Sequence, residues 1–140
     1  MTDLTDYAEL RKHWRPRWLS SIQEFADYDK QRARWLDATN TNPHWSFIEI
    51  MCSYFDDCVL RGGYADAIRH GLVSPAEAEA VTDFHSLAGA YNSPRNDDDD
   101  NAAVLADPEW LRVVESARVA QSKLARLVTD ESERKLLLEP

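Results

Sequence analysis

The sequence lacks several features that mark common functional classes. It has only four glycines and no glycine-rich run, so it contains no phosphate-binding loop. Its two cysteines, Cys52 and Cys58, lie six residues apart in one predicted helix and cannot form a disulfide there. No apolar run approaches the roughly 20 residues of a membrane span, and no secretory leader opens the chain. These absences predict a soluble, cytoplasmic protein with buried, reduced cysteines.

Basic residues are scarce in the middle of the chain. The net charge is −9, and residues 36–110 hold three Lys or Arg against fourteen Asp or Glu, a net charge of −11. Such a segment repels phosphate backbones, so we expect no direct binding to nucleic acid. It attracts cationic protein surfaces and accelerates association with them. The charge distribution therefore favours a basic protein partner.

The apolar residues recur with helical periodicity along the whole chain, and strict strand-like alternation is absent. With 140 residues and 44% hydrophobic content, the chain fits one domain, residues 1–140, with a core of its own. We predict an all-α, single-domain bundle of about five to seven helices. The predicted helices cover residues 3–14, 18–38, 44–61, 64–70, 74–91 and 107–128.

Turn and capping residues set the predicted boundaries. Pro16 is expected to end the first helix, residues 39–43 (TNTNP) form a turn, and Gly62–Gly63 end the third helix. The SPAE sequence from Ser74 combines a hydroxyl cap, a proline and a glutamate at capping-box spacing. Residues 92–107 are predicted to be a long acidic loop before the last long helix. Residues 130–140 form either a final turn or two of helix or a frayed C-terminal tail.

Carboxylates interrupt the apolar stretch FIEIMCSYFDDC. On an α-helical wheel Glu49, Ser53, Asp56 and Asp57 share one arc of about 100°, and the rest of the helix is apolar. An unpaired buried carboxylate would cost several kcal/mol, so this stripe must meet water, an arginine or a partner. The alternatives are a solvated edge, an internal ion pair and a functional surface. The arginines considered for an internal pair are Arg32, Arg34 and Arg69.

No catalytic, metal-binding or cofactor motif stands out, so we expect no enzymatic activity and no cofactor. None of the four histidines follows a glutamate at the Glu-x-x-His spacing of dinuclear sites. The alternative is a small helical metal-dependent enzyme. It would use the carboxylates of Glu49, Asp56 and Asp57 as ligands, with His85 as a further candidate ligand.

Several segments, taken in order, resemble small bacterial immunity proteins of contact-dependent inhibition and related polymorphic toxin systems. They are WSFIEIMCSYFDDC, GLVSPAEAEAVTDFH, AYNSP, the acidic loop and LADPEWLRVVESARVA, and the resemblance covers roughly residues 35–128. It implies a bacterial, cytoplasmic protein without enzymatic activity that binds one cognate toxin, such as a nuclease. Because a nuclease must be basic to hold its substrate, an inhibitor that presents carboxylates gains fast association and charge neutralisation.

The candidate partner-binding residues combine the carboxylate stripe, the aspartate run and two tyrosines expected to be exposed anchors. They are Glu49, Ser53, Tyr54, Asp56, Asp57, Tyr91, Asp97, Asp98, Asp99 and Asp100. A helical scaffold or homodimer is a third alternative, and the sequence leaves the choice between monomer and homodimer open.

Overall fold

The computed structural model describes residues 4–37, 39 and 45–140, with side chains from residue 7 onward. Every regular element in these ranges is helical, as predicted, and there are nine α-helices, more than the five to seven expected. The predicted turn at 39–43 and the predicted helix start at residue 44 lie almost entirely outside the described residues. The α-helices are α1 (Leu4–Ala26), α2 (Tyr28–Trp35), α3 (Phe47–Met51), α4 (Ala65–Arg69), α5 (Pro75–Ala80), α6 (Thr82–Ala90), α7 (Asn101–Ala106), α8 (Pro108–Ala125) and α9 (Glu131–Leu138). Two other helical segments are the π-helix η1 (Cys52–Asp56) and the 3₁₀ turn η2 (Pro94–Asn96).

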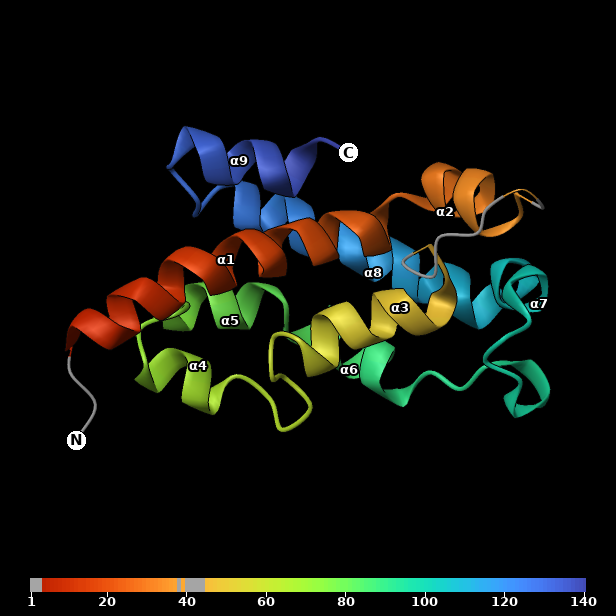
Figure 1. Ribbon diagram of the computed structural model, residues 1–140, viewed down its shortest axis with the longest axis horizontal. Helices are drawn as coiled ribbons and strands as arrows, with labels where there is room; N and C mark the ends of the chain where they lie inside the picture. The colour runs from red at the N-terminus through yellow and green to blue at the C-terminus, as the bar shows by residue number, and fades with distance from the viewer. Residues whose placement is uncertain (1–3, 38, 40–44) are drawn as a thin grey trace.

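The two longest helices, α1 and α8, pack against each other and form the centre of the bundle (Figure 1). Helix α9 contacts both of them, while α6 packs on α8 and η1 packs on α1. An aromatic cluster fills the space between these elements. Its centre is Phe25 of α1, whose ring lies 5.8 Å from Tyr54, 5.0 Å from Phe84 and 5.8 Å from Trp110.

Helix α1 continues through Pro16, so the predicted break at this proline is wrong. Proline removes one backbone hydrogen bond from a helix interior, and here buried side chains on both sides hold the helix in place. Trp14 donates from its indole Nε1 to the Cys58 carbonyl at 2.8 Å, and Trp18 is fully buried. The break comes instead at Asp27, whose carboxylate caps α2 by accepting from the Lys30 backbone N–H.

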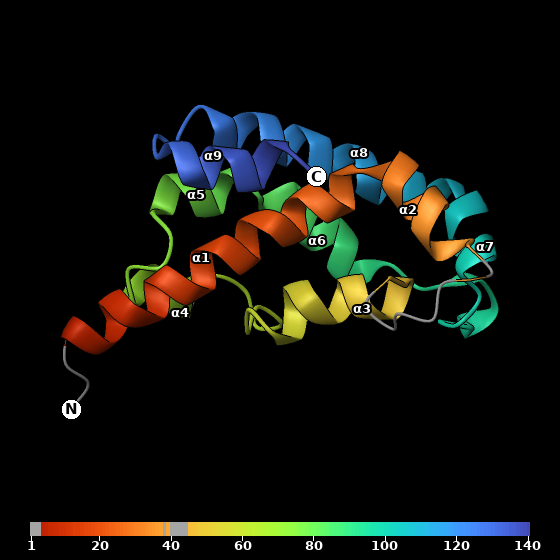
Figure 2. The ribbon, with the colours of Figure 1, turned by 45° about the horizontal axis from the view of Figure 1, so that its top comes forward.

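The predicted helix over residues 44–61 is correct only in part. Ser46 caps α3, but after Met51 the chain widens into the π-helix η1, and Figure 2 shows it turning back before α4. The Asp57 N–H donates to the Cys52 carbonyl, which is the i to i+5 bond of a π-turn. The turn ends at Val59, which has a φ of +56°, before the predicted Gly62–Gly63 cap is reached.

The capping motifs predict the later helices well. Ser74 and Glu77 form both hydrogen bonds of a capping box, and Asp107 caps α8 ahead of Pro108. Val81 divides the predicted 74–91 helix into α5 and α6.

The segment predicted as an acidic loop and the C-terminal segment are both partly helical. The predicted 92–107 loop contains η2 and α7, since Asp100 caps α7 and two residues of that helix, Val104 and Leu105, are buried. The C-terminal segment predicted as a short helix or a frayed tail forms α9. Leu137 of α9 is fully buried, and its carbonyl accepts from Gln121 Nε2 at 2.7 Å.

None of the described helices is long and apolar enough to cross a membrane. Both cysteines are free, and the expectation that both are buried holds for Cys58 alone, because Cys52 is partly exposed. Burial raises the pKa of the Cys58 thiol to about 12, and burial together with the Asp56 carboxylate raises that of Cys52. Both thiols are therefore held in the protonated, weakly nucleophilic form.

Candidate functional site

The residues predicted to form a carboxylate stripe on the 44–61 helix have different neighbours in the structure. Burial raises the pKa of Glu24 of α1, and the charge of Glu49 adds to this effect. Ser53 lines a hollow together with Glu24 and Arg17. Asp56 bonds to Arg61, and the charges of Asp56 and Glu49 both act on the Cys52 thiol.

Asp56 forms an ion pair within the protein, which is one of the alternatives that the sequence leaves open for this carboxylate. Arg61, five residues later, forms two hydrogen bonds to its carboxylate, one of them from Nη2 to Oδ2 at 3.1 Å. The hydrogen bond from Arg61 lowers the pKa of Asp56. None of the arginines considered from the sequence supplies this pair, since Arg69 bonds to Asp66 and Arg34 stacks on Trp45.

The aspartate run is ordered by its own hydrogen bonds. Asp97 accepts from the Asp99 backbone N–H at 3.1 Å, and Asp98 accepts from the hydroxyl of Ser93 at 2.6 Å. Asp100 caps α7 and pairs with Arg95 at 3.1 Å, so its charge is also neutralised. Asp97, Asp98 and Asp99 are exposed, and within the described ranges none of them has an ion-pair partner.

Tyr54 is fully buried, so the expectation that it is an exposed anchor is wrong. Its ring packs on Phe25 and Phe84, and its hydroxyl bonds to the Tyr64 hydroxyl at 2.6 Å and to His85 Nδ1 at 2.9 Å. The aromatic core of the bundle needs a large side chain at this position. The alternation of apolar and acidic residues around Tyr54 in the sequence does not show which of these side chains are buried.

Tyr91 is partly exposed and held rigidly. Its hydroxyl donates to Asp107 Oδ2 at 2.9 Å, and its ring meets Phe47 edge to face at 5.7 Å. Burial and the Asp107 carboxylate raise the pKa of Tyr91, so the phenol stays protonated at neutral pH.

An open hollow joins α3 and η1 to the segment 91–98. We call it the Ile48–Asp98 groove. Its residues are Phe47, Ile48, Met51, Cys52, Arg61, Tyr91, Asn92, Ser93, Asn96 and Asp98. It brings two candidate residues of one segment, Tyr91 and Asp98, beside Ile48 of α3, which lies far from them in sequence. Sequence reasoning missed Ile48, which is 41% exposed, and only that exposure distinguishes it from the buried apolar residues around it.

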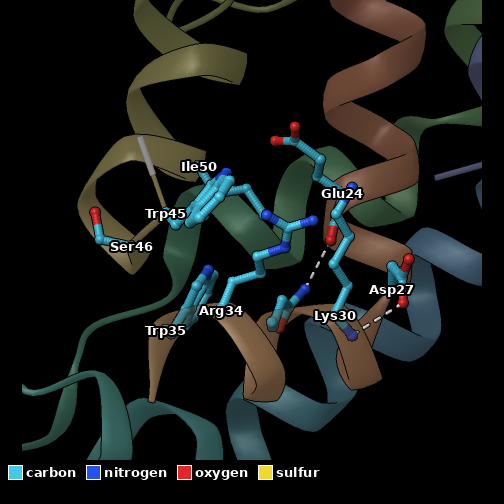
Figure 3. Close-up of a pocket in the computed structure, with 9 residues that line it drawn as sticks. Glu24, Asp27, Lys30, Arg34, Trp35, Trp45, Ser46 and Ile50 are labelled. Carbon is cyan, nitrogen blue, oxygen red and sulfur yellow. Dashed lines mark hydrogen bonds between the residues drawn. The ribbon is translucent and has the colours of Figure 1, made fainter. Parts of the chain in front are cut away.

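Another hollow, of about 50 Å³, lies between the end of α1, α2 and the start of α3 (Figure 3). Two indoles, those of Trp35 and Trp45, line it, and the Arg34 guanidinium lies 4.0 Å from the centre of the Trp45 ring. Its charged residues are two acids, Glu24 and Asp27, and two bases, Lys30 and Arg34. This balance of charge selects neither a cationic nor an anionic ligand, and no candidate residue from the sequence lies in this hollow.

Within the part of the chain that the structure describes, no three His, Cys, Asp or Glu side chains come together as a metal site. The ligand set considered for a metal enzyme is dispersed. Asp56 is bound to Arg61, and His85 Nδ1 is bound to the Tyr54 hydroxyl.

Comparisons with protein-family models, with curated proteins and with solved structures found no match to this chain. The resemblance to immunity proteins therefore has no support from these comparisons, and any function must be argued from the residues themselves.

Proposed function

We propose that this protein is a non-enzymatic binding protein that neutralises a basic protein, as a bacterial immunity protein neutralises its cognate toxin in the cytoplasm. The observation that carries the proposal is the exposed run Asp97–Asp99, which has no countercharge in the described structure and adjoins the Ile48–Asp98 groove. Exposed carboxylates alone attract many cationic proteins. A groove with an exposed apolar residue beside the carboxylates also supports a specific contact with one partner.

The arrangement suits inhibition by surface binding. A basic active site that holds phosphates would be attracted by three adjacent carboxylates, and association would be fastest at low ionic strength. The acidic surface is smaller than the sequence indicates, because Asp56 and Asp100 are paired with Arg61 and Arg95. We therefore assign the electrostatic contribution to Asp97, Asp98 and Asp99, with Asp57 as a further exposed acid.

The test measures binding to the basic protein encoded beside this chain in its genome, by calorimetry at low and high salt. We expect tight binding that weakens as salt rises, together with loss of the partner's toxicity in cells. The triple variant D97N/D98N/D99N should bind at least tenfold more weakly, mainly through slower association.

A control variant separates local charge from total charge. E79Q/D83N/E139Q removes the same number of exposed acids from α5, α6 and the C-terminal end, away from the groove. It should leave binding within about twofold of the wild type. Equal losses in both triple variants, or no binding at any salt concentration, would disprove the proposal.

A further inference from the structure

One wall of the Ile48–Asp98 groove carries a carboxylate that is held in place before any ligand binds. The hydroxyl of Ser93, a residue only 5% exposed, donates to Asp98 Oδ1 at 2.6 Å. This leaves Oδ2 of Asp98 without a hydrogen bond from the described residues. The nearest arginine in sequence, Arg95, is engaged by Asp100. Asp98 is therefore an oriented anion at the edge of the groove.

The groove also offers an apolar and aromatic surface of fixed geometry. Ile48 is 41% exposed, and the Tyr91 ring is held by its hydrogen bond to Asp107 and its contact with Phe47. A cation gains from both a carboxylate and a ring, and the methylene stem of a long cationic side chain packs on apolar atoms. Arg61, the cation among the described residues that line the groove, is already bound to Asp56.

We propose that the Ile48–Asp98 groove receives an arginine or lysine side chain of the basic partner, with the charged head at Asp98 and the stem along Ile48 and Met51. This proposal rests on the binding function proposed above and specifies where one partner residue is anchored. Arginine is favoured, because its planar guanidinium can meet the carboxylate and stack on Tyr91 together.

The first test uses a single side chain as the probe. Nα-acetyl-arginine N-methylamide is titrated into the ¹⁵N-labelled protein, and its uncharged isostere, Nα-acetyl-citrulline N-methylamide, serves as the ligand control. We expect saturable shifts in the amide signals of residues 47–52 and 91–98 with the arginine compound at millimolar affinity, and none with the citrulline compound. Shifts spread evenly over all acidic surfaces, or none that saturate, would overturn the proposal.

Matched variants locate the contact. D98N should weaken arginine binding about tenfold, whereas D83N, which neutralises an exposed acid of α6, should leave it unchanged. I48S should weaken it several-fold, whereas I68S, at an exposed apolar position of α4, should have no effect. Binding unaffected by D98N and I48S would overturn the anchor. Groove signals that shift with protein concentration in the absence of the arginine compound would also overturn the proposal. The groove would then be occupied by a second copy of this protein.

The two proposals can fail separately. If D98N binds the basic protein as tightly as the wild type while the triple variant does not, the anchor site is wrong and the neutralising function stands. If the groove binds arginine but no basic partner is bound or inhibited, the neutralising function is wrong.

Discussion

Arg15 and Glu77 form a buried bidentate ion pair that joins α1 to α5. Arg15 Nη1 lies 3.0 Å from Oε1 and Nη2 lies 2.9 Å from Oε2, and the two side chains are 4% and 9% exposed. The same guanidinium bonds to Glu133 of α9 at 2.7 and 3.1 Å and to the Leu72 carbonyl at 2.9 Å. Three helices that are far apart in sequence thus share one buried cation.

Removing one carboxylate from this network should destabilise the fold. E77Q keeps the size of the side chain but leaves the buried Arg15 with a single carboxylate, so the free energy of unfolding should fall by about 3 kcal/mol. Urea denaturation at pH 7 measures the change. E79Q, at the exposed neighbouring glutamate, should change it by less than about 0.5 kcal/mol. A loss below about 1 kcal/mol for E77Q would show that Glu133 alone satisfies Arg15.

The same pair should make stability depend on acid pH. Burial by itself would raise the pKa of Glu77, but the hydrogen bonds from Arg15 and the Ser74 N–H and the charge of Arg15 outweigh it and lower that pKa. The stabilisation is therefore complete above the ordinary value of 4.5 and is lost as pH falls through the lower folded pKa. Urea denaturation at pH 7 and pH 3 should show the wild type and E77Q converging at low pH. A constant difference would contradict this.

A second pH dependence should come from His85. The Trp18 indole donates to the Tyr64 hydroxyl at 2.8 Å. The Tyr64 hydroxyl can then donate to that of Tyr54, which donates to His85 Nδ1 when neutral His85 carries its proton on Nε2. Protonation at Nδ1 would reverse this chain and leave one buried hydroxyl hydrogen without an acceptor.

Burial lowers the pKa of His85, in agreement with this order of donors. The unfolded chain then binds the proton more readily, so stability should fall as pH drops below the ordinary pKa of 6.5. Stability measured between pH 8 and pH 5 should decline more steeply in the wild type than in H85Q, while H13Q, at an exposed histidine, should match the wild type. A histidine signal for residue 85 that titrates at 6.5 or above in NMR would contradict the prediction.

Val59 should be replaceable with a gain in stability. This β-branched residue has a φ of +56° and is 81% exposed, so it has backbone strain and almost no burial to lose. V59G should raise the free energy of unfolding by about 1 kcal/mol, because glycine adopts this conformation without the steric cost. V119G, at an exposed position inside α8, should lower it by about the same amount. Thermal unfolding of both variants shows whether each substitution raises or lowers the stability.

Pro16 offers a similar test in α1. P16A restores the missing N–H in a helix that already continues through this position, so stability should rise by about 1 to 3 kcal/mol without a change in helical content. Circular dichroism measures the helical content, and urea denaturation measures the free energy of unfolding. A loss of stability would mean that the ring of Pro16 makes a packing contribution larger than the lost hydrogen bond.

Sequence alone determined the features that depend on neighbouring residues. The all-α class, the capping box at Ser74 and Glu77 and the Asp107 cap of α8 follow from groups within four residues of one another. The buried stripe of α8 also follows from periodicity, although Leu127 just beyond the helix is 42% exposed. Such local hydrogen bonds and periodic patterns are present in the sequence itself and need no knowledge of the fold.

Only the tertiary structure decided the features that join distant residues. Helix α1 survives Pro16 because Trp14 and Trp18 are anchored in the core, and the groove exists because the bundle brings Ile48 beside Asp98. These outcomes depend on packing and charge between segments brought together by folding, and no short window of sequence contains both partners.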